Sequence, residues 1–440
     1  MQLNPIVAEK NPWWRDPAAR AARHFPHRRV LQRRVRAQVE NLEDARGVLL
    51  VGPRKVGKTV LLRQTIDDLL DQGWPPHNLT YFDFSDDRIV ADLSPRAVVE
   101  SLPPAYDPEH PRALFFDEIR DSTGWDAWLK QAVDDRLARI VATDSAASLL
   151  RGESRTSGTR VDELHLEGLS FEEFLSLHGA ADETAEQTFR RLPNALERYL
   201  LLGGFPEHSL SENVRLVRER LRRDVVESAI LRDLLPFGID VDAARRLFIY
   251  LVQASGSIFV ARRRGEEIQA DERSVKQYLG LLEDTMLLAS LHSFTARPAV
   301  ALRRSAHPKI YAADHGLIGS FSLAPEEARS QLFEAVVFRH LREIARTRGG
   351  EVGFLRGKDG KNEVDFVVAS GGRRIVIEVT HSARIRAEKL DTVRTAGQIL
   401  RTHDLFLIHG GLDTGVNDGV RLMPLPAFLL DPARILQEGS

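Results

Sequence analysis

The stretch GVLLVGPRKVGKT, residues 47–59, decides the fold of the first part of this chain. Its first six residues form a short apolar run, as in a buried parallel strand. The eight residues from 52 to 59, GPRKVGKT, match the pattern G-x-x-x-x-G-K-[ST]. The helical pattern VLLRQTIDDLLDQG follows directly. A strand, a glycine-containing turn and a helix in this order predict a nucleoside triphosphate site.

Each part of the turn has a chemical reason to be there. The glycines let backbone N–H groups curl around phosphates, and the helix N-terminus adds its positive end. Lys58 is expected to reach the β- and γ-phosphates, and Thr59 to offer a hydroxyl to Mg²⁺. The predicted cofactors are therefore ATP and Mg²⁺. The predicted nucleotide-binding residues are Gly52, Pro53, Arg54, Lys55, Val56, Gly57, Lys58 and Thr59.

A second motif, ALFFDE at 113–118, is an apolar strand candidate that ends in two acids. We expect Asp117 to lie near the Mg²⁺ and Glu118 to act as the general base on the attacking water. An acidic pair at a strand end is a common surface feature by itself. Because this pair follows the lysine motif within an alternating α/β segment, we interpret it as part of the nucleotide site.

Two further positions are candidates for catalysis. The T-D-S stretch that begins at Thr143 ends the next strand candidate, 139–145. A polar side chain there can contact the γ-phosphate or the attacking water, or the stretch could equally be a helix N-cap. Arg151, Arg155 and Arg160 follow, and one of them could act as an arginine finger, in cis or across a subunit interface. We select Arg160, with a plain surface arginine as the alternative.

Alternation of strands and helices extends over the first third of the chain. Strand candidates at 47–52, 79–85, 113–119 and 139–145 are separated by helical patterns. Such alternation predicts a parallel sheet wrapped by helices, an α/β P-loop NTPase core over residues 41–165.

The bulk composition sets limits on the whole chain. A length of 440 residues predicts two or three domains. The net charge of −2 gives no global attraction to nucleic acid, and the absence of cysteine excludes disulfides and thiolate chemistry. No signal peptide and no membrane-length apolar stretch is present, so we expect a cytoplasmic protein without a membrane partner.

The first 40 residues are predicted to form a basic N-terminal extension. Residues 13–37 carry many arginines with interleaved aromatic residues. This segment is either an arm that contacts phosphates or a solvated helix that leads into the first domain.

A helical region is predicted for residues 166–322. Apolar residues recur at helical spacing from 169 to 235, and 244–256, 274–291 and the short 308–316 resemble helices that precede a small winged element. Arg273 and Lys276 lie on the leading turn of one such helix. That helix could enter a DNA major groove, or the element could be a packing module.

The last region, residues 323–440, is predicted to be a separate α/β domain. It begins with a helix at 331–350 and continues with strand candidates at 352–357, 363–370, 373–380 and 404–410.

Several stretches of the chain, from about Arg46 to Gly410, resemble a widespread group of prokaryotic AAA-type ATPases with a C-terminal restriction-endonuclease-like domain of unknown function. The resemblance rests on GPRKVGKT, FFDEIRDSTGWDAWLKQAVD, TDSAASLL, LEGLSFEEFL, YLLLGGFPE, KIYAADHGL, LFEAVVFRHL, NEVDFVV and IVIEVT. It implies an AAA-type core, a middle region with a winged-helix-like element, and a nuclease-like final domain. It also implies that Arg160 corresponds to the arginine of a Gly-Arg pair, which Thr159 interrupts here. Asp144 stands where the group usually has glycine.

The final domain carries the acids that a two-metal nuclease would use. Glu334, Asp365 and Glu378 occur in the right order on a helix and two strands to hold Mg²⁺. The lysine expected two residues after the last acid is replaced by Thr380, and Lys358 or Lys361 would have to substitute for it. We therefore expect a degenerate domain that binds nucleic acid or a protein rather than one that cuts DNA.

Together these patterns predict an ATPase whose nucleotide state rearranges two C-terminal modules. The alternatives are a nuclease under ATP control and a nucleotide-binding scaffold with little turnover. Candidate partners are DNA, further copies of the chain in a homo-oligomer, and an unidentified protein.

Overall fold

The chain divides into two units in the computed structural model, Met1–Glu167 and Gly168–Ser440. The structure describes residues 3–22, 25–41, 43, 46–89, 93–145, 160–179, 185–227, 229–294, 307–322, 328–356 and 363–437.

The first unit is built on a parallel sheet with the strand order β2-β3-β4-β1-β5. The strands are β1 (Gly47–Val51), β2 (Leu79–Asp83), β3 (Ala113–Asp117), β4 (Arg139–Asp144) and β5 (Val161–His165). The first four are the predicted strands, each slightly shorter than expected. Strand β5 was not predicted, because an edge strand is half exposed and its sequence VDELH shows no apolar run.

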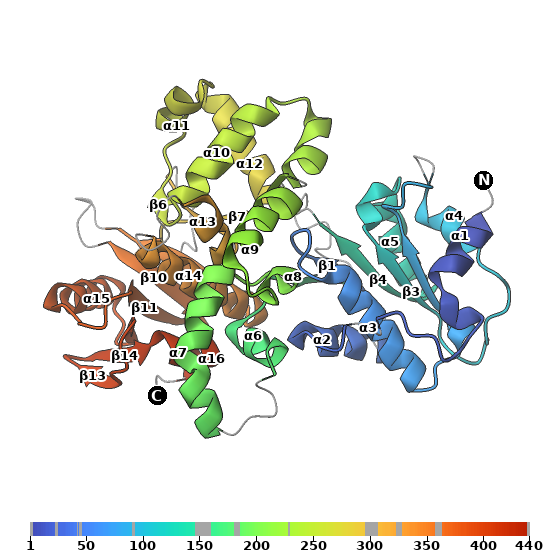
Figure 1. The fold of residues 1–440 in the computed structure, drawn as a ribbon, viewed down its shortest axis with the longest axis horizontal. Coiled ribbons are helices and arrows are strands. Elements are labelled where there is room, and N and C mark those ends of the chain that lie inside the picture. Colours follow the sequence, from blue (N-terminus) through green and yellow to red (C-terminus); the bar gives the residue numbers. More distant parts are fainter. Residues whose placement is uncertain are drawn as a thin grey trace. The chain divides into compact units, whose positions relative to one another are not determined.

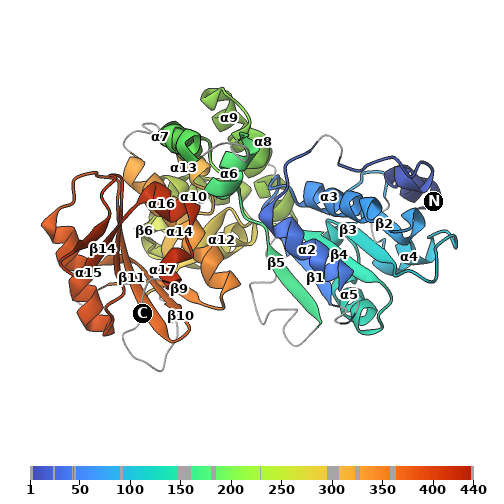
Figure 2. The same ribbon diagram turned by 90° about the horizontal axis from the view of Figure 1, so that it is seen from below.

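Helices cover both faces of this sheet (Figure 2). Val48 and Leu50 of β1 pack in one core cluster with residues of α2 (Val30–Glu40) and α3 (Lys58–Asp71). On the other face lies α5 (Trp125–Asp134), whose Trp128 ring contacts Phe116. Successive strand residues point to opposite faces, so an unbroken apolar strand fits a sheet covered on both sides. The remaining elements of the unit are α1 (Leu3–Lys10), η1 (Pro12–Trp14), η2 (Pro76–Asn78), α4 (Pro95–Glu100) and η3 (Ile119–Asp121).

The predicted N-terminal extension, residues 1–40, packs onto this unit. Trp13 is buried, and its indole N–H donates to the backbone oxygen of Leu79 at 3.0 Å. Arg20 forms an ion pair of 2.6 Å with Asp71 at the end of α3. At least part of the basic charge that suggested a phosphate-contacting arm is thus paired with acids of the same unit.

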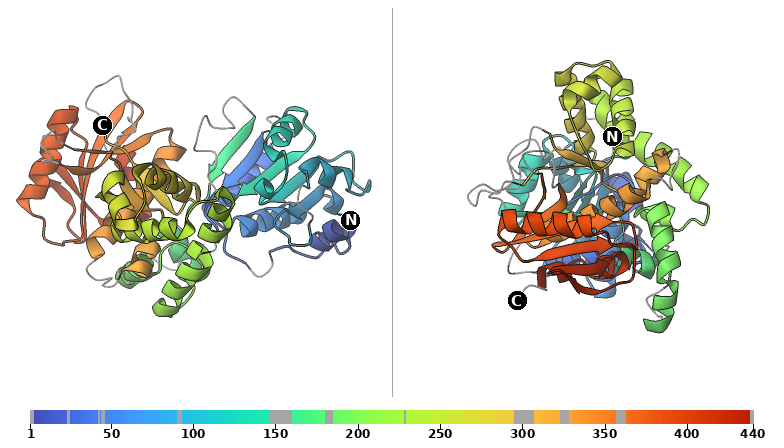
Figure 3. Two further views of the ribbon diagram at one scale, coloured as in Figure 1. Left: turned by 90° about the horizontal axis from the view of Figure 1, so that it is seen from above. Right: turned by 90° about the vertical axis from the view of Figure 1, so that its left-hand side faces the viewer.

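The second unit begins with the predicted helical region. Its helices are α6 (Phe171–Leu177), α7 (Ala185–Leu202), α8 (Pro206–Ser209), α9 (Val214–Arg220), the π-helical η6 (Leu221–Glu227) and η7 (Ile230–Leu234), η8 (Leu235–Phe237), α10 (Val241–Gln253), α11 (Ala261–Ile268) and α12 (Glu272–Asp284). Figure 3 shows α10 to α12, in yellow-green and yellow, standing out from the orange and red sheet of the same unit.

A small antiparallel sheet of order β6-β8-β7 accompanies these helices, with β6 between α10 and α11 and the other two strands after α12. Its strands are β6 (Ser257–Ile258), β7 (Leu288–Leu291) and β8 (Lys309–Ala312). The stretch 308–316 was expected to be helical, and this prediction was wrong for its first half. Ile310 and Tyr311 favour a strand, and helix α13 (His315–Phe321) begins only after them.

A mixed sheet forms the end of the second unit, with the strand order β13-β14-β12-β11-β10-β9. Its elements are α14 (Arg329–Thr347), β9 (Glu351–Leu355), β10 (Val364–Ser370), β11 (Arg373–Thr380), α15 (Ala387–Leu400), β12 (Leu405–His409), β13 (Gly415–Asn417), β14 (Val420–Pro424), α16 (Leu425–Leu430) and α17 (Arg434–Gln437). Phe366 packs with the residues of α14 and Val367 with those of α15, so the two helices cover opposite faces (Figure 1). The predicted helix and four strands are all present. Strands β13 and β14 were not expected.

Asp314 joins three of the segments on which the family resemblance rests. Its carboxylate accepts hydrogen bonds from the backbone N–H of Gly204 at 2.8 Å and of Gly316 at 2.9 Å. A Cβ at Gly168 or Gly203 would come within 2.7 Å of the same carboxylate. These glycines therefore allow close packing around a buried acid.

Candidate functional site

The predicted nucleotide site lies at the carboxyl ends of the strands of the five-stranded sheet. Gly52 follows β1, Asp117 ends β3, and Thr143 lies near the end of β4. Because all these strands are parallel, their carboxyl ends meet at this end of the sheet, where open α/β sheets bind ligands. The structure thus brings the two motifs together.

The loop between β1 and α3 has a backbone that only particular residues can adopt. A Cβ at Gly52 would lie 2.3 Å from the backbone oxygen of Leu166. Gly57 has a φ of 102° and Lys55 a φ of 64°, both in the left-handed region. Such turns point consecutive N–H groups toward one concave side, and the N-terminus of α3 adds its dipole. This cradle fits a phosphate group.

Lys58 is held inside the loop. Its side chain is buried, and Nζ donates to the backbone oxygens of Gly52 at 2.8 Å and Pro53 at 3.1 Å, and to Ser145 Oγ at 2.9 Å. Burial lowers the pKa of Lys58, while the neighbouring carboxylate of Glu118 opposes this shift.

Asp117 is buried among hydroxyl groups. Tyr81 donates to its Oδ2 at 2.9 Å, Thr143 donates to its Oδ1 at 2.6 Å, and Thr59 is also hydrogen-bonded to it. Burial raises the pKa of Asp117, and the hydrogen bonds of Thr143 and Thr59 oppose the shift. A carboxylate beside a threonine hydroxyl is the oxygen set that Mg²⁺ prefers, so the residues fit the predicted metal.

Glu118 has an unusual backbone. Its φ of 48° is left-handed, which costs a non-glycine residue on the order of 1 kcal/mol or more. Its N–H donates to Thr143 Oγ1 at 3.0 Å, and Ser145 donates a short hydrogen bond to its carboxylate. Ser145 therefore contacts both Glu118 and Lys58, two charged residues with predicted roles in hydrolysis.

Two of these site residues lie outside the predicted set. Ser145 was visible only as part of the polar end of a strand. Tyr81 stands in the apolar run LTYFDF, where a tyrosine is indistinguishable from a core residue. Neither sequence context indicates that the side chain reaches Asp117 or Lys58.

Arg160 lies near the amino ends of the strands, whereas the loop lies at their carboxyl ends. Its backbone oxygen accepts from Gly47 N at 2.8 Å, at the amino end of β1. The length of β1, roughly 13 Å at about 3.3 Å per residue interval, separates it from the loop of the same chain. This position does not favour a role in cis. Arg151 and Arg155 lie outside the described residues.

The three acids of the final domain do come together. Asp365 N donates to Glu378 Oε2 at 3.2 Å, and Val379 N donates to Asp365 Oδ2 at 2.9 Å. Lys309 Nζ lies within 4 Å of carboxylate oxygens of both Glu334 and Asp365.

A lysine that the sequence did not predict lies beside these acids. Lys389, on the first turn of α15, forms an ion pair with Glu378, while Thr380 Oγ1 accepts from Ser382 N at 3.3 Å. Lys358 and Lys361 lie outside the described residues. Among the residues that are described, no group of three or more acids or histidines is arranged to hold a metal ion.

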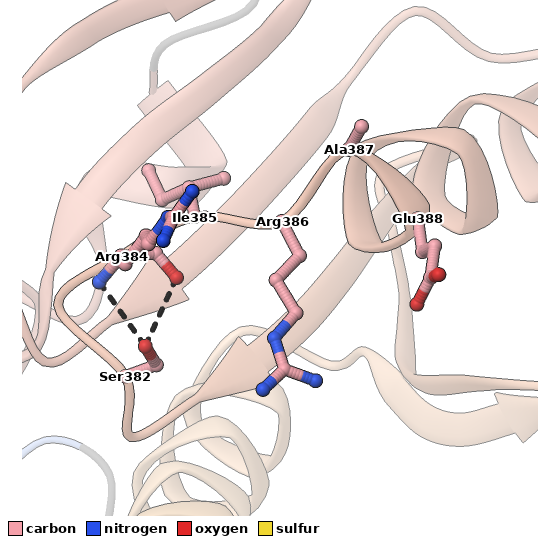
Figure 4. Close-up of a pocket in the computed structure, with 6 residues that line it drawn as sticks. All are labelled: Ser382, Arg384, Ile385, Arg386, Ala387 and Glu388. Atoms are coloured by element: carbon pink, nitrogen blue, oxygen red, sulfur yellow. Dashed lines mark hydrogen bonds between the residues drawn. The ribbon is translucent and has the colours of Figure 1, made fainter.

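A polar hollow of about 570 Å³ lies along the loop between β11 and α15 (Figure 4). Its lining residues are Ser382, Arg384, Ile385, Arg386, Ala387 and Glu388. The Ser382 hydroxyl donates to the backbone oxygen of Arg384 at 2.9 Å and shapes the loop. The sequence patterns did not predict this hollow.

Comparisons with known families divide the chain into three parts. Residues 44–175 match an AAA domain, residues 193–328 a domain of unknown function (DUF8612), and residues 329–428 another domain of unknown function (DUF4143). The chain therefore has a P-loop ATPase domain followed by these two domains. The AAA match implies ATP binding and hydrolysis with Mg²⁺.

Similar proteins from other organisms are uncharacterized. One from Methanocaldococcus jannaschii is 25% identical, over 74% of this chain and 73% of its own length. One from Haemophilus influenzae is 26% identical, over 75% of this chain and 81% of its own length. A solved structure of the Thermotoga maritima RuvB Holliday junction branch migration motor aligns with 59% of this chain and 88% of its own, at 17% identity and a TM-score of 0.29. That similarity is too low to bear on function.

The described helices are not of the kind that cross a membrane. Within the parts of the chain that the structure describes, each helix is too short or too polar for a transmembrane span.

Proposed function

We propose that this chain is a Mg²⁺-dependent ATPase that uses hydrolysis to rearrange its C-terminal modules. The observation that carries the proposal is the hydrogen-bonded connection of Lys58 through Ser145 to Glu118 at the carboxyl edge of the sheet. A phosphate-binding amine and a candidate base in contact with one hydroxyl group are suited to hydrolysis of a phosphoanhydride bond.

Each site residue has a distinct task in this proposal. Bound MgATP supplies the phosphoanhydride bond and a Lewis-acidic metal. Backbone N–H groups of the loop at 52–59 bind the phosphates, and Lys58 neutralises their charge. Thr59 and Asp117 hold the metal. Glu118 accepts the proton of the attacking water, and Thr143 fixes the backbone position of that base.

The C-terminal modules are the proposed responders. We infer that α10 to α12 with the small sheet β6-β8-β7 form a winged-helix-like element, and that α14 with the mixed sheet forms a restriction-endonuclease-like domain without cleavage activity. DNA is the proposed partner of the first. Arg273 lies on the leading turn of α12, while Lys276 there is paired with Glu272. Arg160 is proposed to act across the interface of a homo-oligomer.

The test is an ATPase assay on the purified full chain. Lys58→Ala should weaken ATP binding at least tenfold. Glu118→Gln should keep ATP binding within a few fold and lower kcat by about 10²- to 10⁴-fold, the usual contribution of a general base. Glu100→Gln, at an exposed position at the end of α4, is the control and should behave as wild type.

Two outcomes of the ATPase assay would contradict the proposal. Wild-type protein that binds ATP with Mg²⁺ but has negligible turnover would favour a nucleotide-binding scaffold. Turnover that survives Glu118→Gln would remove Glu118 as the base. The DNA partner is tested separately by adding duplex DNA, which should raise the kcat of the wild type.

A further inference from the structure

A buried lysine stands among the acids of the final domain. Lys309 Nζ lies 2.7 Å from Glu363 Oε1, 3.7 Å from Glu334 Oε1 and 3.9 Å from Asp365 Oδ1. Its side chain is only 4% exposed. The ammonium group is therefore within ion-pair distance of three carboxylates, one on α14 and two that flank Val364, the first residue of β10.

The backbone of Lys309 is fixed on both sides. Strand β8 is the central strand of its sheet, with Lys309 in register with Ile258 of β6 and Leu291 of β7. Its ammonium also lies 5.4 Å from the centroid of the Phe354 ring, a cation–π contact. Strand pairing therefore fixes the backbone of Lys309, and its ammonium lies beside the Phe354 ring.

Tyr311 supports the same arrangement. It lies two residues after Lys309, on the same face of β8, and its hydroxyl donates a short hydrogen bond to Glu334. Its ring stacks on Phe338 of α14 with centroids 4.3 Å apart. Two neighbouring side chains of β8 thus engage acids of the C-terminal domain.

The charges show why a metal does not fit here. A lysine amine is an ammonium at neutral pH, and Lys309 Nζ has carboxylate oxygens of Glu334, Glu363 and Asp365 within 4 Å. A divalent cation bound by Glu334 and Asp365 needs oxygen distances of about 2.0–2.6 Å. It would then compete with the Lys309 ammonium for the same carboxylate oxygens, and the two cations would repel each other. The acids predicted to hold Mg²⁺ therefore do not form a metal site as they stand.

We propose that Lys309 is the cation of this cluster in place of a divalent metal, and that the cluster joins the middle region to the C-terminal domain. Lys309 and Tyr311 belong to the part that matches DUF8612, whereas Glu334, Glu363 and Asp365 belong to the part that matches DUF4143. The ammonium of one part neutralises the acids of the other. This inference is independent of the proposed ATPase function.

The experiment measures Mn²⁺ binding to the nucleotide-free full chain by electron paramagnetic resonance of the free ion. Wild-type protein should show no Mn²⁺ site at these acids tighter than about 1 mM, the weak end of protein cation sites. Lys309→Met should create a site at least tenfold tighter, and adding Asp365→Asn should remove it.

Two controls separate charge from packing. Lys309→Arg keeps a cation among the acids and should not gain Mn²⁺ affinity. Lys276→Met removes an exposed ammonium from α12 of the same unit and should also behave as wild type.

Other outcomes overturn the proposal. Stoichiometric Mn²⁺ binding by the wild type that is lost in Asp365→Asn means that the acids hold a metal despite Lys309. A folded Lys309→Met variant without any gain also contradicts it. If Lys309→Met does not fold, the comparison of wild type with Asp365→Asn decides: equal Mn²⁺ binding supports the proposal, and a loss refutes it.

Discussion

Ser145 contacts Lys58 and Glu118, two charged side chains of the proposed reaction, and a residue in that position should affect the chemical step. Ser145→Ala removes one hydrogen bond to Lys58 and one to Glu118. A hydrogen bond to a charged group contributes about 1.5–3 kcal/mol, so a loss of roughly tenfold or more in kcat is expected, with a smaller change in KM. Steady-state ATPase kinetics measure both constants.

The matched control for this prediction is Ser101→Ala. Ser101 donates to the backbone oxygen of Val98 in the same unit but contacts none of the site residues named here. An unchanged kcat in Ser145→Ala, in protein that is folded and binds ATP, would show that Ser145 does not position the base.

Glu378 gives a prediction for pH. Burial and the nearby Asp365 raise its pKa to about 8, and the same causes raise the pKa of Glu334 to about 7; Lys389 and Lys309 oppose the shifts. In unfolded chain a glutamate ionises near pH 4.5. The folded state therefore holds more protons between these values, and stability that is complete below pH 4.5 is lost as the pH rises through 7 to 8.

The measurement is the melting temperature of the second unit within the full chain, from pH 6 to 9. Wild type should lose stability across this range, by up to about 1.4 kcal/mol per pH unit for each carboxyl that gives up a proton. Glu378→Gln cannot ionise and should flatten the slope. Glu388→Gln, at an exposed position on α15, should leave it unchanged. A slope that is identical in wild type and Glu378→Gln would contradict the prediction.

Local sequence patterns predicted some site residues and missed others for a physical reason. Lys58, Asp117 and Glu118 lie in short motifs, in which the residues that act together are also close in sequence. Lys309 reaches the acids from a strand of the middle region and Lys389 from the helix that follows β11, and only the packing of those elements brings them there.

At the scale of elements, the meeting of three loops at Asp314 gives the next prediction. A Cβ at Gly204 would lie 2.8 Å from Leu169 N and 2.9 Å from Asp314 Oδ2, so backbone must shift. Gly204→Ala should destabilise the second unit by about 1–3 kcal/mol, the usual cost of overpacking. Chemical denaturation of the full chain measures this change.

Gly319→Ala is the matched control. Gly319 lies in α13, and the nearest atom to its added Cβ is 3.8 Å away. Because alanine favours helices over glycine, this variant should be neutral or slightly stabilised. Equal stability of the two variants would mean that the glycines near Asp314 are not needed for packing.

Elements with a strong pattern were predictable, and those governed by their surroundings were not. Strands β1 to β4 and helix α14 have continuous apolar runs or clear helical spacing. Strand β5 lies at a sheet edge, β13 is fully exposed, and β8 is a short strand of four residues read as helix. Strands β5 and β8 pair with strands distant in sequence, and β13 pairs with the neighbouring β14. In each case strand pairing fixes the conformation, and sequence periodicity carries little information about such pairing.

At the scale of the whole molecule, the division into two units predicts a selective response to nucleotide. Thermal unfolding should show two transitions, and ATP with Mg²⁺ should raise only that of the first unit. At one hundred times Kd the stabilisation is about 2.7 kcal/mol, which amounts to several degrees. Differential scanning calorimetry measures both transitions, and Lys58→Ala should abolish the shift. Equal shifts of both transitions would contradict independent units.

The attachment of the N-terminal segment to the first unit has a practical consequence. The AAA match begins at residue 44, but Arg29 donates to the backbone oxygens of Val56 in the phosphate loop, at 3.1 Å, and of Glu167, at 2.9 Å. A truncated protein expressed from residue 44 would also leave the surface under Trp13 open to water. We expect a protein truncated to the matched AAA domain to be insoluble, and a shortened version should retain the first helices.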